Sequence, residues 1–219
     1  MNFQTLSSKK PRPYRHFPHD PEPAEWQGLD NVDWTGPVVI DVGAGSGDWV
    51  VAEAIAKPHT SFIAIERSKN RYTSLYKKIA LSEPANVFAV RADAMALIQQ
   101  KVPDKSVNAI YFFYPNPIPK KRQANKRYFV GSHFAVFHRV LKENGGLYLV
   151  SNIQAYIDES REYLAKIWEY EIVLCGQRAK DLPPRTAFEK KYQGRGEDLF
   201  ELRAIKGNAR PASWLPFVF

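Results

Sequence analysis

One heptapeptide limits the possible folds of this 219-residue chain more than any other segment: Asp41-Val42-Gly43-Ala44-Gly45-Ser46-Gly47. It follows the apolar run at 38–40 and precedes residues 48–56, whose composition predicts a helix. Glycine tolerates positive φ and lets a ligand approach the backbone, and the start of a helix presents free N–H groups. The pattern therefore predicts a strand, a tight turn and a helix that can hold a nucleoside ligand. The alternative is an ordinary strand-to-helix turn that happens to be rich in glycine.

The chemistry of this turn indicates which nucleoside ligand it suits. Its form is G-x-G-x-G and differs from the G-x-G-x-x-G of dinucleotide-binding folds. Asp41, at the end of the strand, would repel a pyrophosphate but suits a cationic ligand. S-adenosylmethionine carries a sulfonium and an ammonium group and no phosphate. We therefore expect S-adenosylmethionine as the cofactor, bound by Asp41, Gly43, Gly45 and Gly47, and we expect no metal.

Apolar runs and helical periods alternate along the rest of the chain. The predicted strands are 38–40, 61–65, 86–90, 107–113, 147–150, 169–174 and 199–205. The predicted helices are 48–56, 68–80 with Ser68 as N-cap, one from about 94, 126–141 ended by Gly145-Gly146, and 154–168. This alternation predicts an α/β fold with a mostly parallel seven-stranded sheet and helices on both faces. Ligands of such sheets bind at the carboxyl ends of the strands, beside the first strand.

Acidic residues follow the second and third predicted strands. Glu66 is placed where a carboxylate can accept hydrogen bonds from both hydroxyls of a ribose. Asp93, followed by Ala94, would face the same crevice, where an adenine amino group could meet it. Asp93 could equally be only the N-cap of the next helix.

Composition limits the classes of partner and the compartment. The net charge of +8 favours a polyanion such as RNA, although a merely basic enzyme is the plain alternative. A single cysteine, Cys175, excludes an internal disulfide and favours a reducing compartment. No run approaches the ~20 apolar residues that cross a bilayer, and no signal-peptide pattern is visible, so we expect a cytoplasmic protein that does not bind membranes. The sequence leaves monomer and homodimer open.

Local composition divides the chain into three parts. Residues 1–37 are rich in proline, histidine and cations, which predicts an extended arm. Residues 38–206 form the α/β domain, and 207–219 an apolar tail. The loop after the fourth strand, Tyr114 to Arg127, combines prolines with cations that could bind phosphates, including Lys120 and Arg122. A later Thr186-x-x-Glu189 also has the form of a capping box.

Taken together, these motifs resemble the bacterial tRNA (guanine-N7)-methyltransferase family over about 38–206. The resemblance rests on the glycine turn, Ile65-Glu66, Ala92-Asp93-Ala94, Tyr114-Pro115-Asn116-Pro117 with Lys120-Lys121-Arg122, Ser151-Asn152 with Tyr156, and Thr186-Ala187-Phe188-Glu189. It implies a Rossmann-like methyltransferase fold that binds S-adenosylmethionine and acts on tRNA. It also implies that Asn116 lies near the methyl group, and that the substrate is held by Lys120, Arg122, Asn152, Tyr156, Thr186 and Glu189.

Two departures from the family pattern concern the acceptor site. The family has Phe-Pro-Asp-Pro-Trp and Thr-Asp where this chain has Tyr-Pro-Asn-Pro-Ile and Ser-Asn, so Asn116 and Asn152 replace carboxylates. An amide stabilises a methylated, cationic purine less well than a carboxylate does. The alternatives that follow are a methyltransferase acting on another RNA base and a catalytically silent protein that binds cofactor and RNA. A small-molecule methyltransferase fits the basic charge less well.

Overall fold

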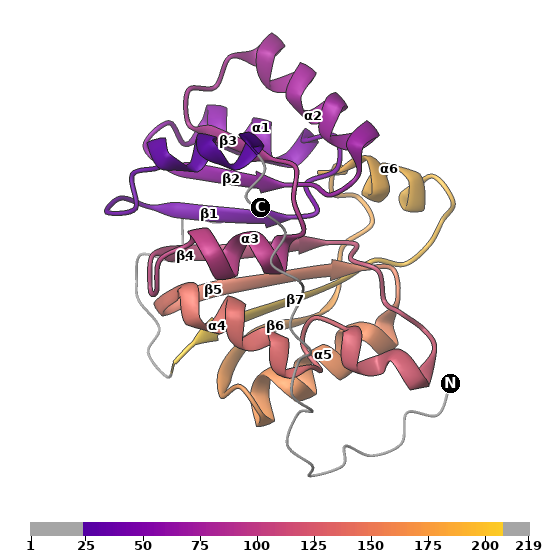
Figure 1. Cartoon of the computed structure of the whole chain (residues 1–219). Coiled ribbons are helices and arrows are strands. Elements are labelled where there is room, and N and C mark those ends of the chain that lie inside the picture. The colour runs from indigo at the N-terminus through magenta and orange to yellow at the C-terminus, as the bar shows by residue number, and fades with distance from the viewer. Residues whose placement is uncertain (1–23, 208–219) are drawn as a thin grey trace.

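The computed structural model describes residues 24–207, so the predictions for 1–23 and 208–219 lie outside the described residues. Its strands form one sheet in the order β3-β2-β1-β4-β5-β7-β6 (Figure 1). The strands are β1 (Val38–Val42), β2 (Ser61–Ile65), β3 (Val87–Val90), β4 (Val107–Phe113), β5 (Leu141–Ser151), β6 (Tyr170–Gln177) and β7 (Phe200–Lys206). β7 runs antiparallel to both of its neighbours, and the other pairs are parallel. The predicted mostly parallel, seven-stranded sheet is confirmed.

Helices cover both faces of the sheet, as predicted. The α-helices are α1 (Asp48–Ala56), α2 (Lys69–Ser82), α3 (Ala94–Lys101), α4 (Ala135–Val140), α5 (Gln154–Lys166) and α6 (Ala187–Gln193). The 3-10 helices are η1 (Ala24–Asn31), η2 (Lys121–Lys126) and η3 (Ser132–Phe134). None of the helices within 24–207 is long and apolar enough to cross a bilayer.

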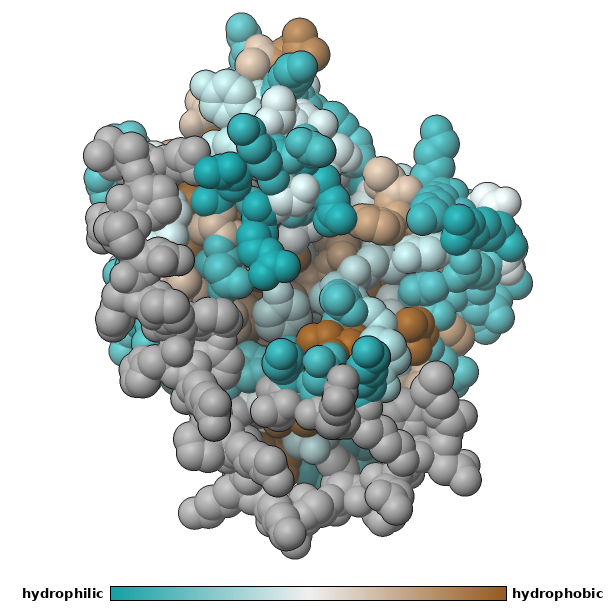
Figure 2. All heavy atoms as spheres, turned by 45° about the vertical axis from the view of Figure 1, so that its right-hand side comes forward, coloured by the Kyte–Doolittle hydropathy of each residue, from teal (hydrophilic) through white to brown (hydrophobic). Residues whose placement is uncertain are grey.

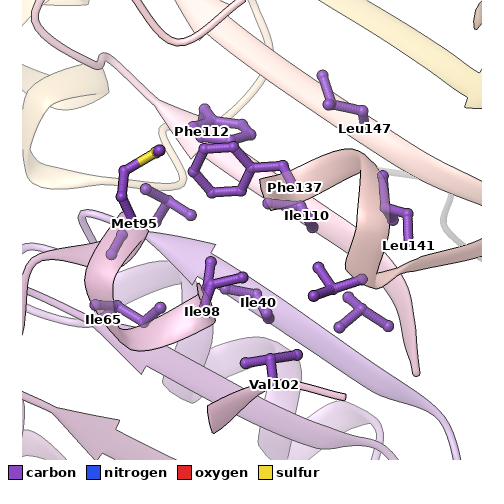
Figure 3. Close-up of a cluster of buried hydrophobic side chains, with 14 of the residues drawn as sticks. Ile40, Ile65, Met95, Ile98, Val102, Ile110, Phe112, Phe137, Leu141 and Leu147 are labelled. Carbon is purple, nitrogen blue, oxygen red and sulfur yellow. The ribbon is translucent and has the colours of Figure 1, made fainter. Parts of the chain in front are cut away.

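Alternation along the strands divides the core in two. Ile40 of β1 and Phe112 of β4 face α3, α4 and α5, where Ile98 and Phe137 pack on them (Figure 3). Their neighbours in sequence, such as Val39, face α1 and α2. Successive strand side chains point to opposite faces, so the period of two seen in these strands produces two apolar layers. Asp41 follows Ile40 and therefore points to the α1–α2 side.

Four sequence predictions need correction within the described residues. The helix expected at 126–141 is confined to η3 and α4. Residues 127–131, which precede η3, form turns, because Phe129 among them packs edge-on against Phe112 of β4. β5 begins at Leu141 rather than at 147, and Gly145-Gly146 lie inside an irregularity of this strand. The predicted extended arm contains η1 at 24–31, whose Trp26 is buried against the sheet. Ser68 precedes α2 as expected, but its side chain makes no capping hydrogen bond.

Candidate functional site

The glycine turn lies where β1 meets α1, at the carboxyl edge of the sheet. Gly43, Gly45 and Gly47 have φ values of 79°, 60° and 81°, a region that favours glycine. The amides of Gly43 and Ala44 both donate to the carbonyl of Ile65, at 2.8 and 3.0 Å, which fixes the turn against the end of β2. A Cβ at Gly47 would collide with the side chain of Leu75. The turn is thus shaped by backbone geometry and by close packing of α2.

Asp41 is the most unusual group of the turn. Its side chain is buried, with the residue 2% exposed, and Oδ1 accepts no hydrogen bond from the described part of the chain. Burial, and secondarily the nearby charge of Glu66, raise the pKa of Asp41 to about 8. A buried carboxylate without a partner is costly, so this position favours a cationic or hydrogen-bond-donating ligand.

Glu66 connects the end of β2 to the turn. One carboxylate oxygen accepts from the amide of Gly45 at 3.0 Å and the other from the amide of Ser68 at 2.7 Å. The guanidinium of Arg71 lies 3.9 Å away. Each carboxylate oxygen keeps a further lone pair, so ribose binding by Glu66 stays a prediction that this geometry permits.

Asp93 serves as a helix cap. Its carboxylate accepts from the amides of Met95 and Ala96, at 3.1 and 3.4 Å, at the start of α3. Ala94 is buried in the first turn of that helix. Capping, the alternative raised by the sequence, is therefore observed, and contact of Asp93 and Ala94 with a cofactor stays a prediction.

A cavity of about 370 Å³ opens beside the glycine turn. Its lining comes from four segments: 41–48, α2, Phe113 at the end of β4, and α6 with the preceding Thr186. Asp41, Gly43, Gly45 and Thr186 are the predicted site residues that meet in it. The guanidinium of Arg71 lies 5.6 Å from the ring centroid of Phe188, so α2 and α6 face each other across the opening.

Asp48 joins the parts of this cavity and was not singled out from the sequence. Its carboxylate accepts from Ser46 Oγ at 2.7 Å, pairs with Lys78 of α2 and accepts from the amide of Ala187. Burial alone would raise the pKa of Asp48, but the hydrogen bonds of Lys78 and Ser46 and the charge of Lys78 lower it below its ordinary value. An acidic residue at the first position of a helix is a start signal, which could have drawn attention to it.

The loop after β4 is held in an unusual conformation. Tyr114 and Ile118 have φ values of 51° and 46°, which is rare for residues with a side chain. Asn116 is exposed, and its Oδ1 accepts from the amide of Ile118 at 3.0 Å, so this amide oxygen stabilises its own loop. Lys120 is exposed at the end of the loop, and the side chain of Arg122 lies outside what the structure describes.

A clamp that the sequence analysis missed holds this loop. Arg127 Nε and Nη2 donate to the carbonyls of Pro117 and Ile118 at 3.0 to 3.2 Å. Its Nη1 donates to both carboxylate oxygens of Glu159 in α5, at 2.7 and 2.6 Å. Arg127 is buried, and a buried guanidinium with this many acceptors defines the position of the backbone that it contacts.

Two of the predicted substrate residues are buried and do not line the cavity. Glu189 has an exposed fraction of zero; it accepts from Arg185 Nη2 at 2.6 Å and from Tyr114 Oη at 3.2 Å. Burial alone would raise the pKa of Glu189, but the hydrogen bonds and the charge of Arg185, together with the charge of Arg178, lower it. Tyr156 is 3% exposed and packs in the core. Both side chains are thus buried in this structure, and direct contact of either one with the substrate stays a prediction.

Thr186 and Asn152 occupy accessible positions. Thr186 Oγ1 accepts from the amide of Glu189 at 3.1 Å and caps α6, as the capping-box pattern predicts for its first half. Asn152 follows β5, and its Nδ2 donates to Glu197 Oε2 at 2.7 Å. Glu197 was not identified from the sequence, because no local signal relates residues that lie 45 positions apart.

Comparison with known proteins gives a consistent assignment. A family model described as "Putative methyltransferase" matches residues 35–202. Proteins named tRNA (guanine-N(7)-)-methyltransferase are similar to this chain. The one from Treponema pallidum is 28% identical over 78% of this chain and 67% of its own length. The one from Staphylococcus carnosus is 25% identical over 85% of this chain and 87% of its own length.

Solved structures agree with the fold. A 16S rRNA methyltransferase, KamB, superposes with a TM-score of 0.60 at 17% identity, over 83% of this chain and 92% of that one. A SAM-dependent methyltransferase from Aquifex aeolicus gives a TM-score of 0.56 at 14% identity, over 78% of this chain and 83% of that one. At these identities the similarity establishes the fold, and it confirms the predicted Rossmann-like architecture.

Proposed function

This chain belongs to the methyltransferase family that it matches over 35–202, and on this premise we propose that it methylates guanine N7 in tRNA with S-adenosylmethionine as the donor. The proposal rests mainly on one carboxylate oxygen of Asp41, which is buried and has no hydrogen-bond partner among the described residues. Asp41 and the glycine turn that follows it line a cavity. The names of the relatives support the acceptor.

The residues of the cavity fit the proposed cofactor. Asp41 offers a carboxylate oxygen that a cationic group can neutralise. A Cβ at Gly43 would meet nothing within 4 Å, so the backbone there is open to a ligand. Glu66 and Asp93 do not line the cavity but follow the neighbouring strands β2 and β3, where Glu66 would accept from ribose hydroxyls and Asp93 from the adenine amino group. When bound, S-adenosylmethionine supplies an electrophilic methyl group on a positively charged sulfur.

The chain has mainly to position the acceptor. Guanine N7 has a free lone pair, so no residue must remove a proton before the methyl group is accepted. Placement and electrostatics then contribute most of the catalysis. The loop at 114–119 would orient the purine, because Arg127 fixes its backbone from one side and Tyr114 bonds to α6 on the other. Asn116 lies at the exposed tip of this loop.

The surface around this edge of the sheet suits a polyanion. Figure 2 brings this edge forward and shows mainly hydrophilic side chains, with small hydrophobic patches between them. Arg71 and Lys191 line the cavity, and Lys120 is exposed at the end of the loop that follows β4. Together with the net charge of +8, these cations support contact with RNA phosphates. We also propose a cytoplasmic location and a monomer or homodimer.

The direct test is product analysis. The protein is incubated with S-adenosylmethionine and tRNA, and the modified nucleosides are identified by mass spectrometry. We expect 7-methylguanosine, its loss in Asp41→Asn, and its retention in Asp30→Asn, which changes an exposed carboxylate on η1. Another methylated nucleoside would establish a different acceptor. Cofactor binding without any RNA product would support the catalytically silent alternative.

A further inference from the structure

Glu197 and Asn152 form a linked polar pair at the carboxyl edge of the sheet. We infer that this pair recognises the N1–H and N2–H₂ donors of the target guanine, with Glu197 supplying the negative charge. The inference rests on the proposed function. It is carried by the hydrogen bond from Asn152 Nδ2 to Glu197 Oε2, at 2.7 Å, between the residue that follows β5 and the loop that precedes β7.

The sheet places this pair beside the acceptor loop. β5 pairs with β4, and the amide of Tyr114 donates to the carbonyl of Val150 at 2.8 Å. β7 is antiparallel to β5, with Phe200 opposite Ser151, so β7 begins at the edge where β5 ends. Asn152 and Glu197 therefore lie at the same edge as the loop that begins with Tyr114.

The backbone of Glu197 is anchored to α6 rather than to a free loop. Its amide donates to the carbonyl of Tyr192 at 3.1 Å, and Gly196 adopts a φ of 71° just before it. The ring of Tyr192 packs 5.2 Å from that of Tyr114, measured between centroids. The backbone that carries this carboxylate is thus fixed to α6, and α6 in turn packs on the first residue of the acceptor loop.

The chemistry of the pair matches guanine. Asn152 uses one amide hydrogen on Glu197, which leaves its Oδ1 as an acceptor next to a carboxylate. Two adjacent acceptors complement the two donors of guanine, N1–H and N2–H₂, whereas adenine presents an acceptor at N1. Glu197 remains accessible, with 34% of its side chain exposed, and the guanidinium of Arg195 lies 3.8 Å from it. Enzymes that act on an extruded base recognise it through such edge contacts.

This arrangement supplies the negative charge that the amide of Asn152 lacks. Asn152 itself carries no charge, and the carboxylate is contributed by Glu197 from another segment. The negative charge therefore lies on Glu197, one hydrogen bond away from Asn152. A purely structural role, in which the pair only holds the end of β5, makes different predictions.

The test measures kcat/KM on two tRNAs that carry either guanine or hypoxanthine at the modified position. Hypoxanthine keeps N1–H but lacks the 2-amino group, so it offers the pair one donor fewer. Glu197→Gln keeps an oxygen that can accept from Asn152 but removes the charge. We expect kcat/KM on guanine to fall roughly tenfold to a hundredfold, the effect of losing a hydrogen bond to a charged group, and the preference for guanine over hypoxanthine to shrink. The double variant Asn152→Asp with Glu197→Gln, which returns the charge to the end of β5, should recover much of both.

Asp198→Asn is the matched control, because Asp198 is the next carboxylate and pairs with Lys180 and Gln177 away from Asn152. It should leave both rates and the base preference unchanged, and Glu197→Gln should leave cofactor affinity unchanged. A Glu197→Gln protein with wild-type rates and base preference would overturn the inference while the proposed function stands. Equal losses on both bases would instead assign the pair a structural role. A wild-type protein that forms no 7-methylguanosine would refute the proposed function itself.

Discussion

Replacing Asp41 by asparagine should make the free protein more stable at neutral pH while weakening its hold on the cofactor. The pKa of Asp41 is raised from 3.8 to about 8 in the folded protein, first by burial and then by Glu66. Between these two values the folded chain keeps a proton that the unfolded chain has lost. The contribution of this group to stability is therefore complete below about pH 4 and is lost as the pH rises towards 8.

The size of this effect follows from the shift. One pKa unit corresponds to about 1.4 kcal/mol, so between pH 5 and pH 8 the linkage has a ceiling of about 4 kcal/mol. Water that reaches the cavity raises the effective dielectric constant around Asp41, and we expect about 1–3 kcal/mol. The amide introduced by Asp41→Asn has no charge to bury, so the variant should lack this component of the pH dependence.

Urea unfolding at pH 5 and pH 8 measures the difference directly. The free energy of unfolding of wild type should fall more between the two pH values than that of Asp41→Asn, by the amount given above. Other titrating groups are common to both proteins and cancel in this comparison. Asp30→Asn, on the exposed side of η1, should follow the wild-type profile.

Cofactor binding supplies the second half of the test. The positive charge of S-adenosylmethionine near Asp41 should expel the proton, so binding at pH 6.5 should release up to about one proton from wild type and none from Asp41→Asn. Calorimetry in buffers of different ionisation enthalpy measures that number. Parallel stability profiles for the two proteins, together with equal proton release, would refute the assignment of a protonated, buried Asp41.

Three further substitutions test the scaffold of the site. Gly47→Ala should destabilise the protein by about 1–3 kcal/mol in urea unfolding, because its Cβ would collide with Leu75 at a positive φ; an unchanged midpoint would contradict this. Arg127→Ala leaves the carboxylate of Glu159, whose side chain is 15% exposed, without its buried partner and should cost up to about 3–5 kcal/mol; a variant that keeps wild-type stability and kcat would show that the clamp on the acceptor loop is dispensable. Trp26→Ala should lower the free energy of unfolding by about 3–5 kcal/mol, because Trp26 of η1 is buried in the core; an unchanged temperature of thermal unfolding would contradict this.

Short-range patterns in the sequence were sufficient for much of the architecture. The predicted helix at 48–56 and the strand at 107–113 have the observed bounds of α1 and β4. The glycine turn, with positive φ at Gly43, Gly45 and Gly47, was predicted from residue type. These features depend on backbone preferences and on hydrophobic periods, which neighbouring residues express whatever the rest of the chain does.

Long-range packing decided the features that the sequence left hidden. The aromatic segment before α4 has a helical period, yet its contacts with Phe112 and the clamp of Arg127 hold it in turns. Glu189 has the sequence context of a substrate residue, but three chain segments close around it.

Residue types alone predicted that Asp41 belongs to a cofactor-binding turn, because it is an acid at the end of an apolar strand. Its raised pKa could not, because burial and the field of Glu66 arise only when β1 and β2 pair. The hydrogen bond between Asn152 and Glu197 likewise depends on the tertiary structure, because it forms only where β5 ends beside the start of β7. Local chemistry determines which groups are present, and the topology of the sheet determines which of them meet.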